Sequence, residues 1–299
     1  MLTQLLPPRI DASKMTIIPH KISLIIFGLL LLSVVACSPL VVLDAGHEPS
    51  HPGALATCGK QEMDYNDAVV TILAGALGDY RVLLTRPAQA EVAADVKGLS
   101  AYLSQEAQLK WPHRKTLFAR AALANKNKAD VFISIHHDST AGLWQINNPA
   151  LCGGKGGKNL AAAFKQKYQV GFNIFINDNK VEPCRSLSLE IAQLIAKRLI
   201  AIGRVAADHH LDDCKSCHSI DSRLGIWHQD LAVLREAAMP AILIEVGNIV
   251  DPDDEAIISA SEFRQQFAQI IRAALAEYFA ASHPRRQTTE HAYSACVFL

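Results

Sequence analysis

The sequence has no excess charge of either sign, because 29 lysine and arginine residues balance 29 aspartate and glutamate residues. Proteins that hold nucleic acids or anionic membranes electrostatically carry a basic excess. We therefore expect no nucleic-acid partner. Internal repeats and long low-complexity segments are also absent between residues 40 and 282. With half of its 299 residues apolar, the chain can bury one sizeable core.

Long apolar runs are scarce, and the one present is ISLIIFGLLLLSVVA at residues 22–36, preceded by two lysines. It is shorter than the roughly 20 residues of a membrane-spanning helix but suits a secretory signal. We predict a signal peptide over residues 1–36 and an exported protein, periplasmic or anchored as a lipoprotein. Residues 34–37 (VVAC) resemble a bacterial lipobox, which predicts a lipid tether at Cys37. A soluble secreted product and an uncleaved anchor are the alternatives.

Six cysteines remain after Cys37, an even number that favours disulfides in an oxidising compartment without identifying the pairs. They are Cys58, Cys152, Cys184, Cys214, Cys217 and Cys296. The stretch CKSCH, Cys214 to His218, also matches the C-x-x-C-H pattern of covalent haem attachment. A loop disulfide is the preferred interpretation, with free thiols or a metal site second and haem third.

Apolar strand patterns alternate with helical patterns along the chain. The strand patterns cover residues 40–44, 80–85, 129–137, 170–176 and 241–247. The helical patterns cover residues 62–77, 114–125, 186–202 and 261–280. This alternation predicts an α/β fold with a buried sheet covered by helices on both faces. Such sheets place their chemistry beyond the carboxyl ends of the strands.

Titratable residues stand at those strand ends. His47 follows the first strand in DAGH, His136 closes the third in ISIHHDS, and Glu245 lies within the last in ILIEVGN. Glu62 opens the first helix, at the end that faces the same edge of the sheet. Two imidazoles and one carboxylate with an open fourth position form a catalytic zinc set. Glu245 would then remain as a general base.

These motifs together resemble the zinc-dependent N-acetylmuramoyl-L-alanine amidases, the enzymes that cut bacterial peptidoglycan. The resemblance rests on DAGH, the Pro52–Ala54 turn followed by Glu62 and Asn66, ADVFISIHHDS, and LREAAMPAILIEVGNIVDPDDE, in this order over residues 40–280. It implies a single-domain, mixed, mainly parallel sheet flanked by helices on both faces. It also implies hydrolysis of the amide between N-acetylmuramic acid and L-alanine of the stem peptide.

The resemblance assigns Zn²⁺ to His47, Glu62 and His136, and assigns catalysis to Glu245. Its substrate would be peptidoglycan or a released muropeptide. Three neighbouring residues could compete: His137 and His51, for which we favour peripheral roles, and Glu48, whose position beside His47 would strain a tetrahedral site. Strand alternation predicts that His136 and His137 point to opposite faces.

Residues 139–169 form an insertion with a glycine-lysine stretch, CGGKGGKN. Its spacing is not that of a phosphate-binding loop, so we expect a rim of the substrate groove instead. In some members of the family an insertion here carries a helix that blocks zinc until a protein activator moves it. No carboxylate that could reach zinc is evident in this stretch, and the sequence identifies no activator.

The predicted organisation is a signal peptide over 1–36, a catalytic domain over 37–282 and a tail over 283–299. Two other functions remain open from the sequence: a non-catalytic peptidoglycan-binding protein on the same fold, and a zinc peptidase acting on another amide. Because all four expected catalytic positions are occupied, hydrolysis of the wall amide is the preferred function.

Overall fold

The computed structural model describes residues 38–139, 168–210, 214 and 216–286. Internal contacts divide the chain into two units, Met1–Ser38 and Pro39–Leu299, and every element below belongs to the second. The predicted signal peptide, Cys37 and most of the 139–169 insertion lie outside the described residues. Within the described part, no helix is both long and apolar enough to span a membrane.

A seven-stranded sheet with the order β2-β1-β3-β7-β4-β6-β5 forms the centre of the fold. Neighbouring strands run parallel except for the β4–β7 and β5–β6 pairs. The strands are β1 (Leu40–Ala45), β2 (Arg81–Leu84), β3 (Val131–Asp138), β4 (Asn173–Ile176), β5 (His218–Asp221), β6 (Ile226–His228) and β7 (Ala241–Asn248). The predicted mixed, mainly parallel sheet is confirmed.

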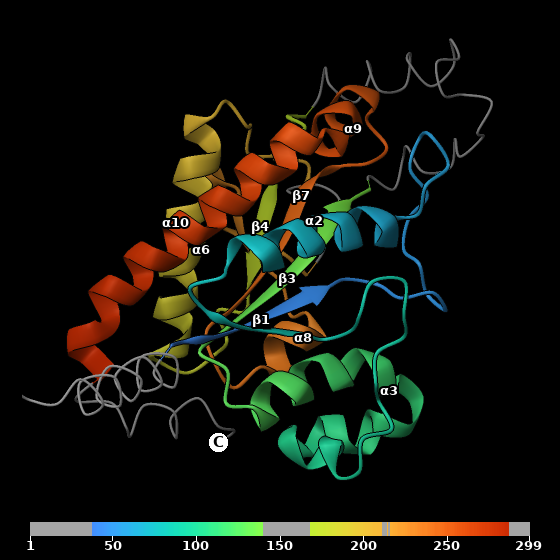
Figure 1. Cartoon of the computed structure of the whole chain (residues 1–299), viewed down its shortest axis with the longest axis vertical. Helices are drawn as coiled ribbons and strands as arrows, with labels where there is room; N and C mark the ends of the chain where they lie inside the picture. The colour runs from blue at the N-terminus through green and yellow to red at the C-terminus, as the bar shows by residue number, and fades with distance from the viewer. Residues whose placement is uncertain (1–37, 140–167, 211–213, 215, 287–299) are drawn as a thin grey trace, which may run out of the picture. The chain divides into compact units, whose positions relative to one another are not determined.

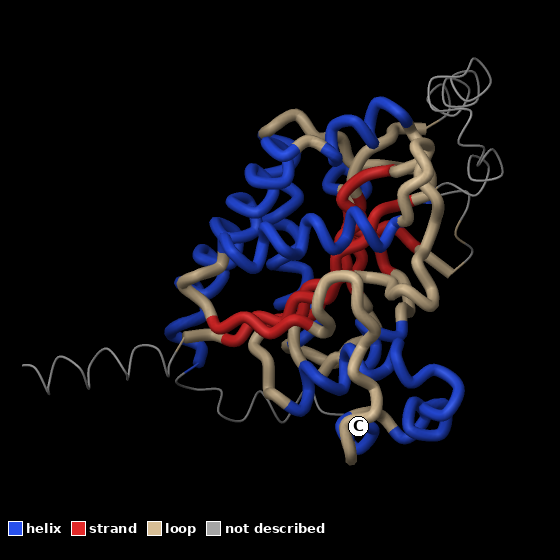
Figure 2. Tube along the Cα trace, turned by 45° about the vertical axis from the view of Figure 1, so that its right-hand side comes forward, coloured by secondary structure: helices blue, strands red, loops and turns tan. Residues whose placement is uncertain are grey.

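Helices cover both faces of this sheet, with α2, α6 and α10 on one side and α3 and α8 on the other (Figures 1 and 2). The helices are α2 (Glu62–Ala76), α3 (Gln105–Lys126), α6 (Cys184–Ala201), α8 (Ala232–Glu236), α9 (Pro252–Ser259) and α10 (Ser261–Arg286). Two short 3₁₀ turns, η2 (Leu99–Tyr102) and η4 (Ser222–Leu224), complete the described elements.

Side chains that alternate along the strands pack into an apolar core on each face of the sheet. Under α2, α6 and α10, the sheet contributes residues such as Leu43, Ile135 and Ile244, all fully buried. The opposite face contributes Phe132 and Leu243, which pack near α3 and α8. On this second face the side chains become polar toward the carboxyl end of β3 and β7. Of the candidates on strands, His136 and Glu245 therefore lie on the face that α3 and α8 cover.

The five predicted strands and four predicted helices all form, but with corrected bounds. α3 begins at Gln105 rather than residue 114, and its non-helical residue Arg114 follows Pro112, which marks a kink. α10 continues to Arg286, past the predicted domain end at 282. Strands β5 and β6 and helices α8 and α9 were not predicted, because segments of three to eight residues show little periodicity.

The pairing of cysteines in the structure decides between the interpretations of the CKSCH stretch. Cys214 and Cys217 form a disulfide, which leaves neither thiol to bond to haem. The preferred interpretation of this stretch, a loop disulfide, is therefore confirmed. Cys184 is also disulfide-bonded, and among the described residues Cys58 is a free, exposed thiol.

Asp44 of β1 is a buried charge that joins four elements. Its carboxylate accepts hydrogen bonds of 2.6 Å from Thr85 after β2, Ser134 of β3 and Arg120 of α3. Burial alone would raise the pKa of Asp44, but Arg120 and the two hydroxyl groups hold this pKa below its ordinary value. The carboxylate is therefore charged at neutral pH and fixes α3 against the central strands.

Replacing Asp44 should destabilise the fold strongly. Asp44→Asn places amide hydrogens against the donors and leaves Arg120 without its carboxylate, so we expect the free energy of unfolding to fall by about 3 kcal/mol. Urea denaturation measures this change. Asp95→Asn is the matched control, because that side chain is 95% exposed and lies 3.6 Å from the Lys115 amine. Similar losses in both variants would contradict the assigned role of the Asp44 network.

Candidate metal and catalytic site

The chain after β1 makes a tight turn that places His47 over the sheet edge. A Cβ added to Gly46 would lie 2.2 Å from Nε2 of His136, so no other residue fits there without moving that ring. His47 itself adopts a left-handed backbone conformation with φ of 63°, which is uncommon for a non-glycine residue. The glycine before the histidine is thus required by close packing against His136.

Two arginines hold this turn through its carbonyl groups. Arg86 donates from Nε to the carbonyl of His47 at 2.8 Å and from Nη2 to that of Gly46 at 3.2 Å. Arg120 donates to the same His47 carbonyl at 2.6 Å. Arg86 also forms an ion pair of 2.7 Å with Asp67 of α2. The unusual backbone conformation of His47 is therefore fixed from two sides.

Glu62 is the first residue of α2, and the start of that helix is anchored to the preceding loop. The backbone N–H of Glu62 donates to the carbonyl of Ala54 at 2.8 Å, and Ala54 donates to Oε2 of Glu62 at 3.2 Å. A Cβ at Gly53, which has φ of 83°, would meet Oε2 of Glu62 at 2.6 Å. The absence of a side chain at Gly53 therefore leaves space for the Glu62 carboxylate and the His47 ring.

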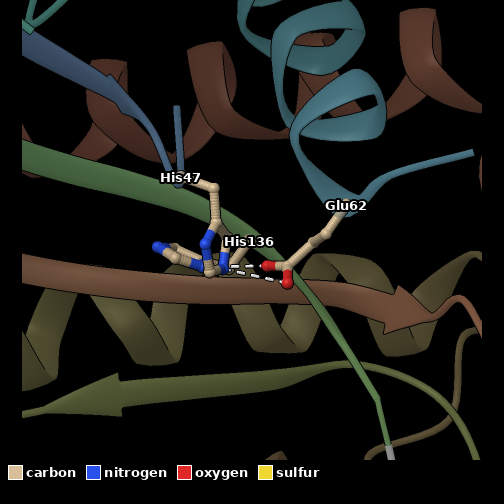
Figure 3. A group of neighbouring side chains, drawn as sticks. All are labelled: His47, Glu62 and His136. Carbon is tan, nitrogen blue, oxygen red and sulfur yellow. Dashed lines mark hydrogen bonds and ion pairs between the residues drawn. The ribbon is translucent and has the colours of Figure 1, made fainter. Parts of the chain in front are cut away.

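The three predicted metal ligands converge (Figure 3). Nε2 of His47 lies 2.9 Å from Oε2 of Glu62, and Nδ1 of His136 lies 3.0 Å from Oε1. One ligand atom from each side chain falls within 4.8 Å of the others. Burial opposes the charge on Glu62, but the two imidazoles hold its pKa far below the ordinary value. A carboxylate and two imidazoles are thus ready to bind one cation.

His137 points to the other face of the sheet, as strand alternation predicts. Its Nδ1 lies 2.7 Å from Oδ1 of Asn66, and its ring packs near Tyr65 of α2. Burial lowers the pKa of His137 to about 3, so it is neutral. The Asn66 amide also donates to the carbonyl of Gly46 at 3.0 Å. His137 is therefore a core residue that helps to position α2.

Glu245 pairs in register with His136 across β3 and β7, which places both side chains on the same face. Its Oε2 is buried and has no hydrogen-bond partner among the described residues. Burial raises the pKa of Glu245 well above its ordinary value, and the nearby carboxylates of Asp138 and Glu62 raise it further. This carboxyl group is available for proton transfer.

A second polar group beside Glu245 was not predicted from the sequence. The Oδ2 atom of Asp138 lies 2.7 Å from Nε2 of His209 and 3.1 Å from Nε2 of His210. Both histidines follow α6, and Asn173 of β4 approaches Asp138 at 3.4 Å. Alternation places Asp138 on the same face as His136, which was the available signal. The two histidines could not be linked to Asp138 from the sequence, because they lie far from it along the chain.

A cavity of about 630 Å³ opens beside the predicted metal ligands. His47 and His136 line it from the sheet, His113 and Arg114 from the kinked part of α3, and Arg235 from α8. The α3 kink, at the non-helical residue Arg114, therefore lies at the cavity. The cavity has the size of a ligand site, and its lining contains basic, acidic and apolar groups.

The other predicted competitors do not join the ligand set. His51 is exposed, and its carbonyl lies 3.1 Å from Nδ1 of His47. Glu48 is buried and accepts from the backbone of Val92 at 3.3 Å, while its Oε2 lies 4.0 Å from Arg120. Neither residue belongs to the group that could hold a metal at His47. The glycine-lysine stretch lies outside the described residues.

Comparison with known proteins identifies the family of this domain. Residues 41–277 match the family model described as N-acetylmuramoyl-L-alanine amidase. The amidase AmiA of Salmonella typhimurium is 23% identical over 247 residues, which cover 80% of this chain and 76% of that protein. AmiA of Escherichia coli matches to the same extent.

Solved structures agree in fold. The amidase Ami1 of Mycobacterium smegmatis is 19% identical, covers 81% of this chain and 97% of its own, and superposes with a TM-score of 0.55. The amidase CwlD of Clostridioides difficile, solved in complex with the GerS lipoprotein, is 18% identical over 81% of this chain and 99% of its own, with a TM-score of 0.52. The chain therefore belongs to the N-acetylmuramoyl-L-alanine amidase family.

Proposed function

We propose that the chain carries out the reaction of its family at the site formed by His47, Glu62, His136 and Glu245. This reaction hydrolyses the amide between the lactyl group of N-acetylmuramic acid and L-alanine of the stem peptide. The observation that carries the proposal is the convergence of two imidazoles and a carboxylate from three segments, beside a buried carboxyl oxygen of Glu245 that has no hydrogen-bond partner among the described residues.

The donor set fits Zn²⁺. Zinc prefers imidazole nitrogen and carboxylate oxygen, and catalytic sites provide three protein ligands and one open position. A Cβ at Gly46 would overlap the His136 ring, and one at Gly53 would overlap Glu62 and the His47 ring, so both turns leave free the space that the ligands occupy. When bound there, Zn²⁺ would lower the pKa of a water molecule toward about 7 and polarise the amide carbonyl.

Glu245 would transfer the proton that hydrolysis requires. It would accept a proton from the attacking water as the water oxygen bonds to the carbonyl carbon, and would return that proton to the leaving nitrogen of L-alanine as the C–N bond breaks. A general acid–base group works best with a pKa near the working pH, and burial moves the pKa of Glu245 in that direction. The peptide's carboxylate groups would face His113 and Arg114 in the cavity lining, because the Arg235 guanidinium is already paired with Asp230 and Glu236.

The substrate also bears on location and partners. Peptidoglycan lies outside the cytoplasm, so the function agrees with export by the predicted signal peptide. We retain the lipid on Cys37 as a proposal, with a membrane tether as its consequence. An amidase of this fold has been solved with a lipoprotein bound. A protein activator for this chain is a proposal of the same kind.

The products formed from purified muropeptides test the function directly. We expect free stem peptides with an N-terminal L-alanine, detected by mass spectrometry. This activity should disappear with a chelator and return with Zn²⁺. Peptides cut at an internal bond would indicate a zinc peptidase instead. Intact muropeptides in the presence of bound zinc would favour a binding protein or a requirement for an activator.

Glu245→Gln should separate catalysis from metal binding. The substituted amide keeps the size of the side chain but cannot accept the proton from water, so we expect turnover to fall by about 10²–10⁴-fold. Zinc content, measured by plasma mass spectrometry on the same sample, should equal that of the unchanged protein. Loss of zinc from this variant would show that Glu245 is a ligand, contrary to its proposed role.

Gly46→Ala should weaken the metal site without unfolding the domain. Its new methyl group would displace the His136 ring, so we expect zinc affinity to fall by about 10–100-fold in competition with a fluorescent chelator. Gly75→Ala is the matched control, because a Cβ on this exposed glycine of α2 meets nothing within 4 Å. Unchanged affinity in Gly46→Ala, with circular dichroism confirming the fold, would refute the packing argument.

A further inference from the structure

We propose a second divalent-metal site, formed by Asp178, His218 and His228, that is separate from the catalytic centre and stabilises the edge of the sheet. The best-suited ion is Zn²⁺, because the donors are two imidazoles and one carboxylate. One ligand atom from each of the three side chains lies within 4.8 Å of the others. The inference does not depend on the proposed enzymatic function.

The position of this cluster follows from the reversed direction of β4. Asn173 at the start of β4 pairs with Glu245, whereas Phe175 pairs with Leu243, nearer the start of β7. Asp178 follows the end of β4 and therefore lies toward the opposite edge from Glu245. β6 runs parallel to β4 and ends with His228 at that same edge. The cluster thus has its own location in the fold.

Strand pairing places the two histidines together. His218, the first residue of β5, is the register partner of His228, the last residue of β6. Directly paired residues in an antiparallel ladder have Cβ atoms about 4.5–5.5 Å apart. The rings stack with centroids 4.5 Å apart and an angle of 22° between their planes. Backbone geometry therefore provides the two nitrogen donors.

The carboxylate of Asp178 completes the set. Its Oδ2 lies 2.7 Å from Nε2 of His218, and its Oδ1 lies 2.5 Å from Nδ1 of His228. These two histidines are its ion-pair partners among the described residues. The nearby Lys180 amine instead donates to the carbonyls of Arg235 and Ala237, at 2.9 and 2.5 Å. In the part of the chain that the structure describes, no lysine or arginine forms an ion pair with Asp178.

Hydrogen bonds alone do not satisfy both contacts of Nδ1 of His228. The backbone N–H of Asp178 donates to Nδ1 of His228 at 3.1 Å, which requires a lone pair on that nitrogen. A hydrogen bond from the same nitrogen to the Asp178 carboxylate would require a proton there. A divalent cation held between that nitrogen and the carboxylate would take the place of the proton.

The cluster is open to solvent and is held by the surrounding chain, as suits a site that binds a metal ion from solution. The side chain of His218 is 57% exposed and that of Asp178 is 27% exposed, whereas His228 is buried at 7%. The Cys214–Cys217 disulfide closes the turn immediately before His218. β5 is an edge strand of four residues, a length at which pairing alone is weak. The metal would tie β5, β6 and the turn after β4 together.

Metal stoichiometry tests the proposal. The full, oxidised chain is stripped with a chelator, dialysed against Zn²⁺ and analysed by plasma mass spectrometry. We expect His218→Ala and Asp178→Asn each to hold one ion fewer than the unchanged protein. Asp95→Asn, which removes a 95% exposed carboxylate outside the cluster, should hold the same number as the unchanged protein. Equal zinc content in all four proteins would overturn the proposal.

A second pair of variants separates this site from the catalytic one. His136→Ala should lose one ion, and His136→Ala with His218→Ala should lose two. In the His136→Ala background, Zn²⁺ should raise the melting temperature, and this increase should vanish when His218 is also replaced. Loss of an ion in His218→Ala but not in His136→Ala would refute the catalytic assignment alone. An unchanged zinc-dependent increase after replacement of His218 would refute the second site.

Discussion

The carboxylate of Asp44 is the interaction on which the site depends. It accepts hydrogen bonds from Thr85, Ser134 and Arg120, which belong to three different segments. Arg120 then donates to the carbonyls of Ala45 and His47. One buried charge thereby fixes α3, the central strands and the turn that presents His47. A buried ion pair such as Asp44–Arg120 contributes little net stability. It nevertheless specifies one arrangement, because breaking the pair leaves a buried charge unpaired.

The arrangement fixed by Asp44 matters because three carboxyl groups, those of Glu62, Asp138 and Glu245, lie close together at the carboxyl ends of the central strands. Glu62 is paired with His47 and His136, and Asp138 is paired with His209 and His210. The buried oxygen of Glu245 has no such partner among the described residues, and burial and both neighbouring carboxylates raise its pKa. Grouping buried acids in this way costs stability, so it is expected where proton transfer or cation binding requires it.

The sequence indicated the parts of the site that stand at strand ends. His47, His136 and Glu245 could be placed at one edge because long, buried strands show clear patterns, and the motifs around them resemble one family. The pairing of Asp138 with His209 was not predictable, because it depends on where the chain returns after α6. The paired histidines of β5 and β6 were missed for a related reason: strands of three or four residues have too little pattern to reveal their register.

The reversal of β4 separates two kinds of chemistry on one sheet. In an all-parallel sheet every carboxyl end would lie at the same edge, and polar strand ends would gather there. Here Asn173 begins β4 beside Glu245, so the carboxyl ends of β4 and β6 lie at the other edge. Asp178, which follows β4, and His228, which ends β6, therefore lie away from the predicted catalytic ligands. A metal at this edge would bind without competing for His47 or His136, and it would stabilise the strand pair farthest from β1 in the sheet order.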